Sequence, residues 1–159
     1  MGAFTLIHVA ISLVGIFAGF VVIFDMLGSK LSKCWTATFL WATLATSVTG
    51  FMFPIRGFTP AIGLGIISVV VLAFTLRAIY HQKLAGASRT IYVVGTVLAQ
   101  YFNCFVLIAQ SFQKIPALHA LAPTQQEPPF ALAQGVTLVG FIVLGVLAVR
   151  KFRPALSVA

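Results

Sequence analysis

Five long apolar stretches occupy most of this chain and limit the folds that it can adopt. We place them at residues 3–26, 35–55, 60–79, 91–112 and 130–149, with short polar segments between them. About 20 apolar residues in an α-helix cross the hydrocarbon core of a bilayer. Lipid offers the backbone no hydrogen-bonding partner, so such segments cross it as helices. The sequence therefore predicts an all-α integral membrane protein, a single bundle of five transmembrane helices.

The sparse charge supports a membrane location and argues against nucleic acid as a partner. Only 8% of the residues are charged, whereas about a quarter of a soluble domain is charged. The net charge of +8 comes from basic residues in the short segments between apolar stretches, where they indicate topology and contacts with membrane lipids. Cys34 and Cys104 lie in separate segments without a CxxC spacing, which indicates neither a disulfide nor a redox pair.

The distribution of basic residues predicts the orientation in the membrane. With the N-terminus outside, only Arg56 and Lys114 of the ten basic residues face the exterior. Loops rich in Lys and Arg stay on the cytoplasmic side. We therefore expect a multi-pass cell-membrane protein with an external N-terminus and a cytoplasmic C-terminus, and we expect the bacterial inner membrane as its location. The external loop, residues 113–129, is rich in proline, and residues 116–121 within it can form a short interfacial helix.

The fourth apolar stretch carries a polar stripe, formed by Tyr92, Thr96, Gln100, Asn103 and Gln110. At 100° per residue these side chains fall within an arc of roughly 80° on one helix face. One hypothesis is helix packing, in which the amides bond across to Thr46, Ser47 or Gln134, each bond contributing about 0.6–2 kcal/mol. The other is a lining for a small neutral solute, water or a quinone-like head group. The candidate ligand-binding or pore-lining residues are Thr96, Gln100, Asn103, Gln110 and Gln134.

Three glycines are candidates for close helix packing. Gly15 and Gly19 form a GxxxG pair in the first apolar stretch, and Gly140 lies in the last one. A glycine lets the backbone of another helix approach closely. These positions predict contact surfaces, either within the bundle or with another subunit.

The predicted external half holds a set of candidate site residues, which are His8, Met52, Arg56, His119 and Glu127. His8 and His119 could together ligate haem b, and Met52 is a further possible ligand. The chain has no HxxxH pair and no spacing of His and carboxylate typical of a metal site. We therefore expect neither haem nor metal, and we interpret both histidines as interfacial hydrogen-bonding groups.

Acidic residues are too few to indicate an enzyme. The chain has two, Asp25 and Glu127, on opposite predicted faces of the membrane, which excludes catalysis by paired carboxylates. Asp25 is interpreted as an interfacial carboxylate partly neutralised by Lys30 and Lys33, or alternatively as part of an ion pathway. We find neither a Ser/His/Asp set nor a glycine-rich phosphate loop. The expected function is a non-enzymatic binding or accessory subunit of a homo-oligomer or larger membrane complex. The alternatives are a passive small-solute channel lined by the polar stripe, and a haem b or quinone-binding redox protein.

Overall fold

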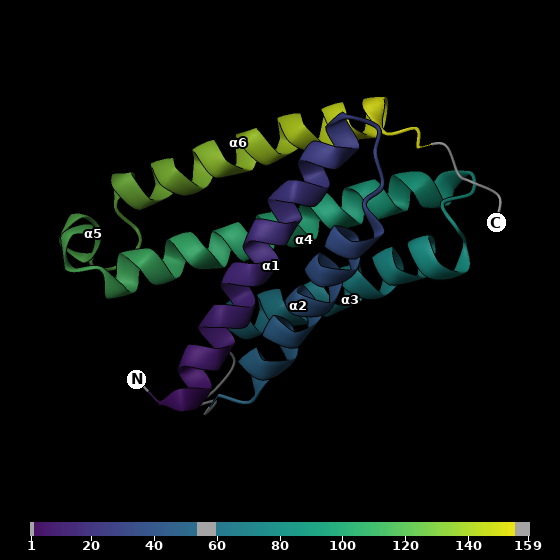
Figure 1. Cartoon of the computed structure of the whole chain (residues 1–159). Helices are drawn as coiled ribbons and strands as arrows, with labels where there is room; N and C mark the ends of the chain where they lie inside the picture. Colours follow the sequence, from purple (N-terminus) through teal and green to yellow (C-terminus); the bar gives the residue numbers. More distant parts are fainter. Residues whose placement is uncertain (1, 54–59, 155–159) are drawn as a thin grey trace.

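The computed structural model describes residues 2–53 and 60–154, and within these ranges it is helical, with no strand. The elements in order are α1 (Ala3–Leu27), α2 (Lys33–Phe51), α3 (Pro60–Leu76), the π-helical turn η1 (Arg77–His81), α4 (Ala87–Lys114), α5 (Pro116–Leu121) and α6 (Pro128–Lys151). The predicted all-α class is confirmed. Figure 1 shows the long helices packed as a bundle, with α5 as a short helix beyond the end of α4.

Four helical segments are long and apolar enough to cross a membrane, which supports a membrane-embedded protein. They are α1, the continuous segment Ile62–His81 formed by α3 and η1, α4, and α6. Helix α2 is not among them. It has 19 residues, and five threonines and a serine interrupt its apolar sequence. The second predicted stretch therefore forms a helix, while its role as a fifth span does not follow from length and hydropathy.

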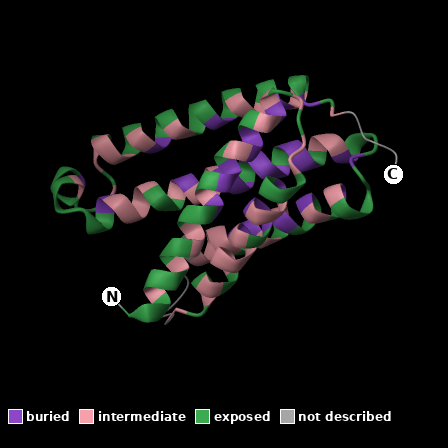
Figure 2. Ribbon diagram, in the orientation of Figure 1, coloured by how far each residue is buried: buried purple, intermediate pink, exposed green. Residues whose placement is uncertain are grey.

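Helix α4 is the central element of the bundle. It packs against α1, α3 and α6, and it also touches α2. In Figure 1, α4 runs between α3 and α6 while α1 crosses over it. Of the residues in its apolar window 44% are buried, against 17% for α6, and Figure 2 shows the buried residues concentrated there. The most polar of the four candidate spans is thus the one best shielded from lipid.

The ends of α4 and α6 are joined by both apolar and polar contacts. The rings of Tyr92 and Phe152 lie 5.7 Å apart, and both side chains are fully buried. Beside them, the guanidinium of Arg89 donates hydrogen bonds to the backbone carbonyls of Val149 and Phe152. The last carbonyls of a helix have no partner within the helix, and a cation there also interacts favourably with the helix dipole. Arg89 therefore caps the C-terminal end of α6 from the N-terminal end of α4.

The contact between α3 and α4 depends on a glycine. A Cβ placed on Gly95 would overlap with the hydroxyl of Thr75 and would lie 3.2 Å from the Thr75 Cβ. The Thr75 hydroxyl is held in position by a 2.7 Å hydrogen bond to the Val71 carbonyl. Neither group can move aside cheaply, so the two helices approach this closely only with glycine at position 95.

We therefore expect Gly95→Ala to destabilise the protein by about 1–3 kcal/mol, the usual cost of overpacking a well-packed interior. Thermal unfolding in detergent micelles is the measurement. Gly135→Ala is the matched control, because an added Cβ there meets no neighbouring described atom within 4 Å. Equal stability of the two variants would contradict the close contact at Gly95.

Candidate functional site

The polar stripe of α4 faces the interior of the bundle. Tyr92, Thr96 and Gln100 are fully buried, while Asn103 and Gln110 are half-buried. The helix is therefore rotated so that its polar side chains are turned toward other helices. This is the arrangement that membrane lipid favours, because an amide exposed to hydrocarbon would have no hydrogen-bonding partner.

Gln100 lies at the contact between α4 and α1. Its Nε2 donates a 2.8 Å hydrogen bond to the backbone carbonyl of Ile16. The rest of the amide lies against Gly19, where a Cβ would overlap with it and would also lie 2.8 Å from the ring of Phe39. Its Oε1 has no hydrogen-bond partner within the described residues, and the α-hydrogen of Gly19 is directed toward this oxygen. Weak Cα–H···O contacts of this kind recur where helices approach closely.

Two further stripe residues bond to α2. Asn103 Nδ2 donates to the hydroxyl of Thr43 at 3.0 Å, and the hydroxyls of Tyr92 and Thr36 lie 3.2 Å apart. The predicted acceptors Thr46 and Ser47 do not fill this role, because their hydroxyls bond to Ser12 of α1 and to the Thr43 carbonyl. Thr36 and Thr43 lie seven residues apart, which is about two helical turns, and therefore share the face of α2 that meets α4.

Gln134 lies apart from the stripe, although we grouped it with those residues on the basis of sequence. Its Nε2 donates a 3.1 Å hydrogen bond to the backbone carbonyl of Phe105, which joins α6 to another side of α4. The Gln134 Oε1 has no hydrogen-bond partner within the described residues. Near the end of α4, Gln125 donates to the Ala109 carbonyl at 2.6 Å, and half-buried Gln110 is adjacent in sequence. These amides join helices and loops to one another.

The hydrogen bonds of the stripe favour helix packing over a pore lining. Gln100 and Asn103 are both bonded to other helices. Two cavities among the described residues have no stripe residue in their walls. One cavity, of about 410 Å³, is lined by Trp41, Ala73, Leu76, Arg77, Tyr80 and His81.

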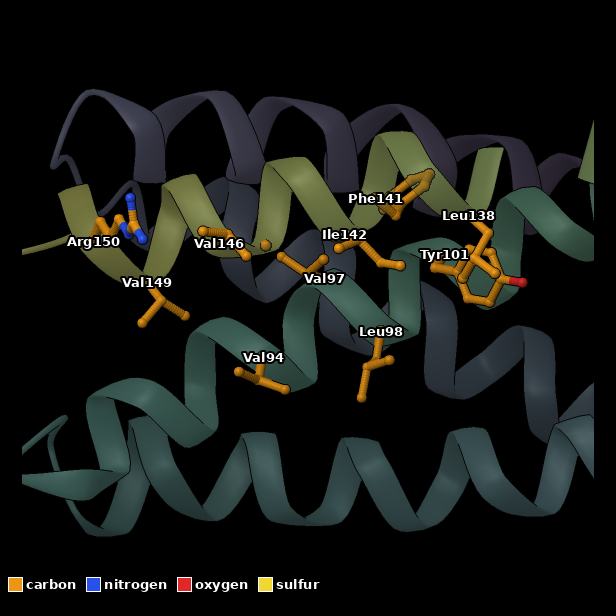
Figure 3. Close-up of a pocket in the computed structure, with 11 residues that line it drawn as sticks. Val94, Val97, Leu98, Tyr101, Leu138, Phe141, Ile142, Val146, Val149 and Arg150 are labelled. Carbon is orange, nitrogen blue, oxygen red and sulfur yellow. The ribbon is translucent and has the colours of Figure 1, made fainter. Parts of the chain in front are cut away.

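The other cavity is an apolar groove of about 400 Å³ between α4 and α6, drawn in Figure 3. The lining residues are Val94, Val97, Leu98, Tyr101, Leu138, Phe141, Ile142, Gly145, Val146, Val149 and Arg150. Sequence reasoning missed this groove, because ten of its residues are of the types that any lipid-facing helix carries. Arg150, a basic residue directly after an apolar run, was the one available signal.

The candidate residues of the predicted external half lie in different elements. His8 Nδ1 lies 2.7 Å from the hydroxyl of Thr49, and its ring packs edge-on against Phe53, so this histidine contributes to the α1–α2 contact. His119 is exposed on α5, and Met52 is 67% exposed. Arg56 lies outside the described residues. Within those residues no three His, Cys, Asp or Glu side chains are grouped as a metal site requires.

The two carboxylates have different surroundings. Glu127 is partly exposed just before α6, where its oxygens accept hydrogen bonds from the Thr124 hydroxyl and from the backbone amides of Thr124 and Gln126. Desolvation acts to raise the pKa of Glu127, but these hydrogen bonds outweigh it and lower the pKa below its usual value. Asp25 Oδ2 is buried, and it has no hydrogen-bond partner among the residues that the structure describes. The predicted neutralising residues, Lys30 and Lys33, are exposed.

The contact between Gly19 and Gln100 can be tested by a double-mutant cycle. Gly19→Ala should destabilise the bundle by about 1–3 kcal/mol, because the added methyl group collides with the Gln100 amide. In a Gln100→Ala background the same change should cost less, because the amide is gone. Gly15→Ala is the control, since a Cβ there would lie 3.4 Å or more from its neighbours, Ala42 and Thr43. Additive effects of Gly19→Ala and Gln100→Ala would show that the two residues do not interact.

The contacts described above are the basis for assigning a function to this bundle. Comparisons of the chain with protein-family models, with curated proteins and with solved structures found no match.

Proposed function

We propose that the chain crosses the membrane five times, with its N-terminus outside. Helix α2 is the span that needs support, because its hydropathy is low. Several of its polar side chains are satisfied inside the bundle: Ser47 and Thr49 donate to carbonyls of their own helix, and Thr43 accepts from Asn103. Such internal bonds reduce the cost of placing hydroxyls in lipid. Helix α2 also packs along both α1 and α3, and five spans keep most basic residues on one side of the membrane.

We further propose that the protein is a non-enzymatic binding or accessory subunit that acts within a homo-oligomer or a larger membrane complex. The observation that carries this proposal is the position of Gly140. Gly15, Gly19 and Gly95 each face another helix closely, whereas a Cβ on Gly140 would meet no neighbouring described atom within 4 Å. Gly140 is an exposed residue of α6. A contact that uses this glycine must therefore come from another molecule.

The residues around Gly140 form a face suited to another helix. Val136 is 65% exposed, Val139 is 61% exposed and Val143 is 51% exposed. At 100° per residue these three valines lie on the same side of α6 as Gly140. Valine has one strongly preferred rotamer in a helix, so it loses little side-chain freedom when it packs. Small and β-branched side chains beside a glycine allow two helices to approach closely in a membrane.

We expect cross-linking between subunits at this face. In a Cys34→Ser background, Val143→Cys should form disulfide-linked dimers when membranes are oxidised, because the two copies of α6 would lie in contact. Val70→Cys on α3, which is 50% exposed, is the matched control and should stay monomeric. Gly140→Leu should abolish the Val143→Cys dimers and reduce the size of the particle in native gels.

A larger complex gives a different pattern from a homo-oligomer. Purified protein with Val143→Cys would then stay monomeric after oxidation, while the same variant, labelled at the new thiol with a benzophenone maleimide and irradiated in native membranes, would cross-link to a different protein. Absence of both products, together with an unchanged particle size for Gly140→Leu, would contradict the proposed role of this face.

The topology is tested separately with reporter fusions. Fusions after Lys33 and after Arg89 should report the cytoplasm, and a fusion between Pro116 and Pro128 should report the exterior, because basic loops stay inside. A fusion within residues 54–59 should also report the exterior if α2 crosses the membrane. An external reading at Arg89 would show that α2 does not cross.

A further inference from the structure

The groove between α4 and α6 is apolar along its length and open to the surface of the bundle. Its walls are aliphatic and aromatic side chains, and Gly145 lies between them. A Cβ on Gly145 would already lie 3.4 Å from Val97, so the two helices nearly touch there. On either side of this contact stand Val94 and Val146, which are 42% and 46% exposed. The groove therefore has a closed floor and a side that would face lipid.

The dimensions of the groove fit one lipid tail. From Leu138 to Arg150 it follows α6 for about 18 Å at 1.5 Å per residue. One leaflet of a bilayer contributes about half of the ~30 Å hydrocarbon core. The volume, about 400 Å³, lies at the lower end of the range for small-molecule sites. Figure 3 shows Arg150 at one end and Tyr101 with Leu138 at the other, with the Tyr101 hydroxyl directed away from Arg150.

The end of the groove at Arg150 is positively charged. Arg150 is exposed and lines the groove, Lys151 follows it directly, and Arg153 lies three residues after it. Arg89 is nearby, but its guanidinium is occupied by the carbonyls at the end of α6. No acidic residue is present in the groove lining. Arg150 is thus placed to meet an anionic group at the membrane surface while an attached apolar chain follows the groove.

We propose that this groove binds an anionic phospholipid, with one acyl chain between α4 and α6 and the headgroup phosphate at Arg150. A zwitterionic lipid carries an ammonium group as well, which the neighbouring basic residues repel, so a lipid of net negative charge is favoured. Arginine matches phosphate because its planar fork can donate two parallel hydrogen bonds. The proposed topology would place this lipid in the cytoplasmic leaflet, because Arg150 then lies on the cytoplasmic side. The binding itself does not depend on that topology.

The test compares lipid retention by purified protein in detergent, measured by native mass spectrometry. Phosphatidylglycerol and phosphatidylcholine with identical acyl chains are titrated separately. We expect phosphatidylglycerol to be retained more strongly, and Arg150→Gln to reduce its retention about fivefold. Lys151→Gln is the matched control, because it removes a neighbouring charge that does not line the groove. Val146→Phe should reduce retention of both lipids by filling the groove, whereas Val70→Phe on α3, a half-exposed position that does not line the groove, should not.

The proposal would be overturned by equal retention of the two lipids, by equal effects of Arg150→Gln and Lys151→Gln, or by retention that Val146→Phe leaves unchanged. Stronger retention of a free fatty acid than of phosphatidylglycerol would also overturn it, because the ligand would then lack a phosphate. These measurements need neither an oriented membrane nor a partner protein. Failure here therefore leaves the proposed subunit role untouched, and failure of the cross-linking experiment leaves lipid binding untouched.

Discussion

The arrangement of this bundle depends on the lack of hydrogen-bonding partners in lipid. Helix α4 has three amides and several hydroxyls within its predicted membrane span, and each needs either a partner or burial away from lipid. The bundle provides both by placing α4 at its centre. Gln100 reaches the backbone of α1, and Asn103 reaches Thr43 of α2. The less polar helices α1, α3 and α6 can then lie around it with their apolar side chains facing lipid.

Because these polar groups are used for helix packing, we expect partners and ligands to bind at the outer surface of the molecule. Side chains bonded between helices cannot also hold a solute without breaking those bonds, each of which is worth only a modest amount of energy in a membrane. Two surfaces of the described residues that remain without a partner are the face of α6 around Gly140 and the groove that ends at Arg150. The two lie on different sides of the same helix. A neighbouring subunit and a lipid could therefore bind to α6 together.

The sequence was sufficient to predict the helical class and the face of α4 that is buried, because helical periodicity determines which side chains share a face. The sequence did not identify the hydrogen-bonding partners of the polar side chains in α4. Thr43 rather than Thr46 accepts from Asn103 because the position of α2 against α4 sets the register, and no pattern within one helix records that register. Gly19 was recognisable as a packing residue, but its neighbour proved to be an amide of the same chain. The groove went unpredicted, because its lining comes from two distant segments with ordinary apolar residues.

The partners of the polar residues in α4 have an order along the chain that matters for synthesis. Ile16, Thr36 and Thr43, which bond to Gln100, Tyr92 and Asn103, all precede α4 in the chain. A nascent chain emerges N-terminus first, so α1 and α2 have already left the ribosome when α4 reaches the translocon. The most polar of the four candidate spans thus follows, in the chain, the groups that bond to it. Gln134, by contrast, lies in α6 and donates its hydrogen bond to a backbone carbonyl of α4. The hydrogen bonds of Tyr92, Gln100 and Asn103 therefore do not depend on the arrival of α6.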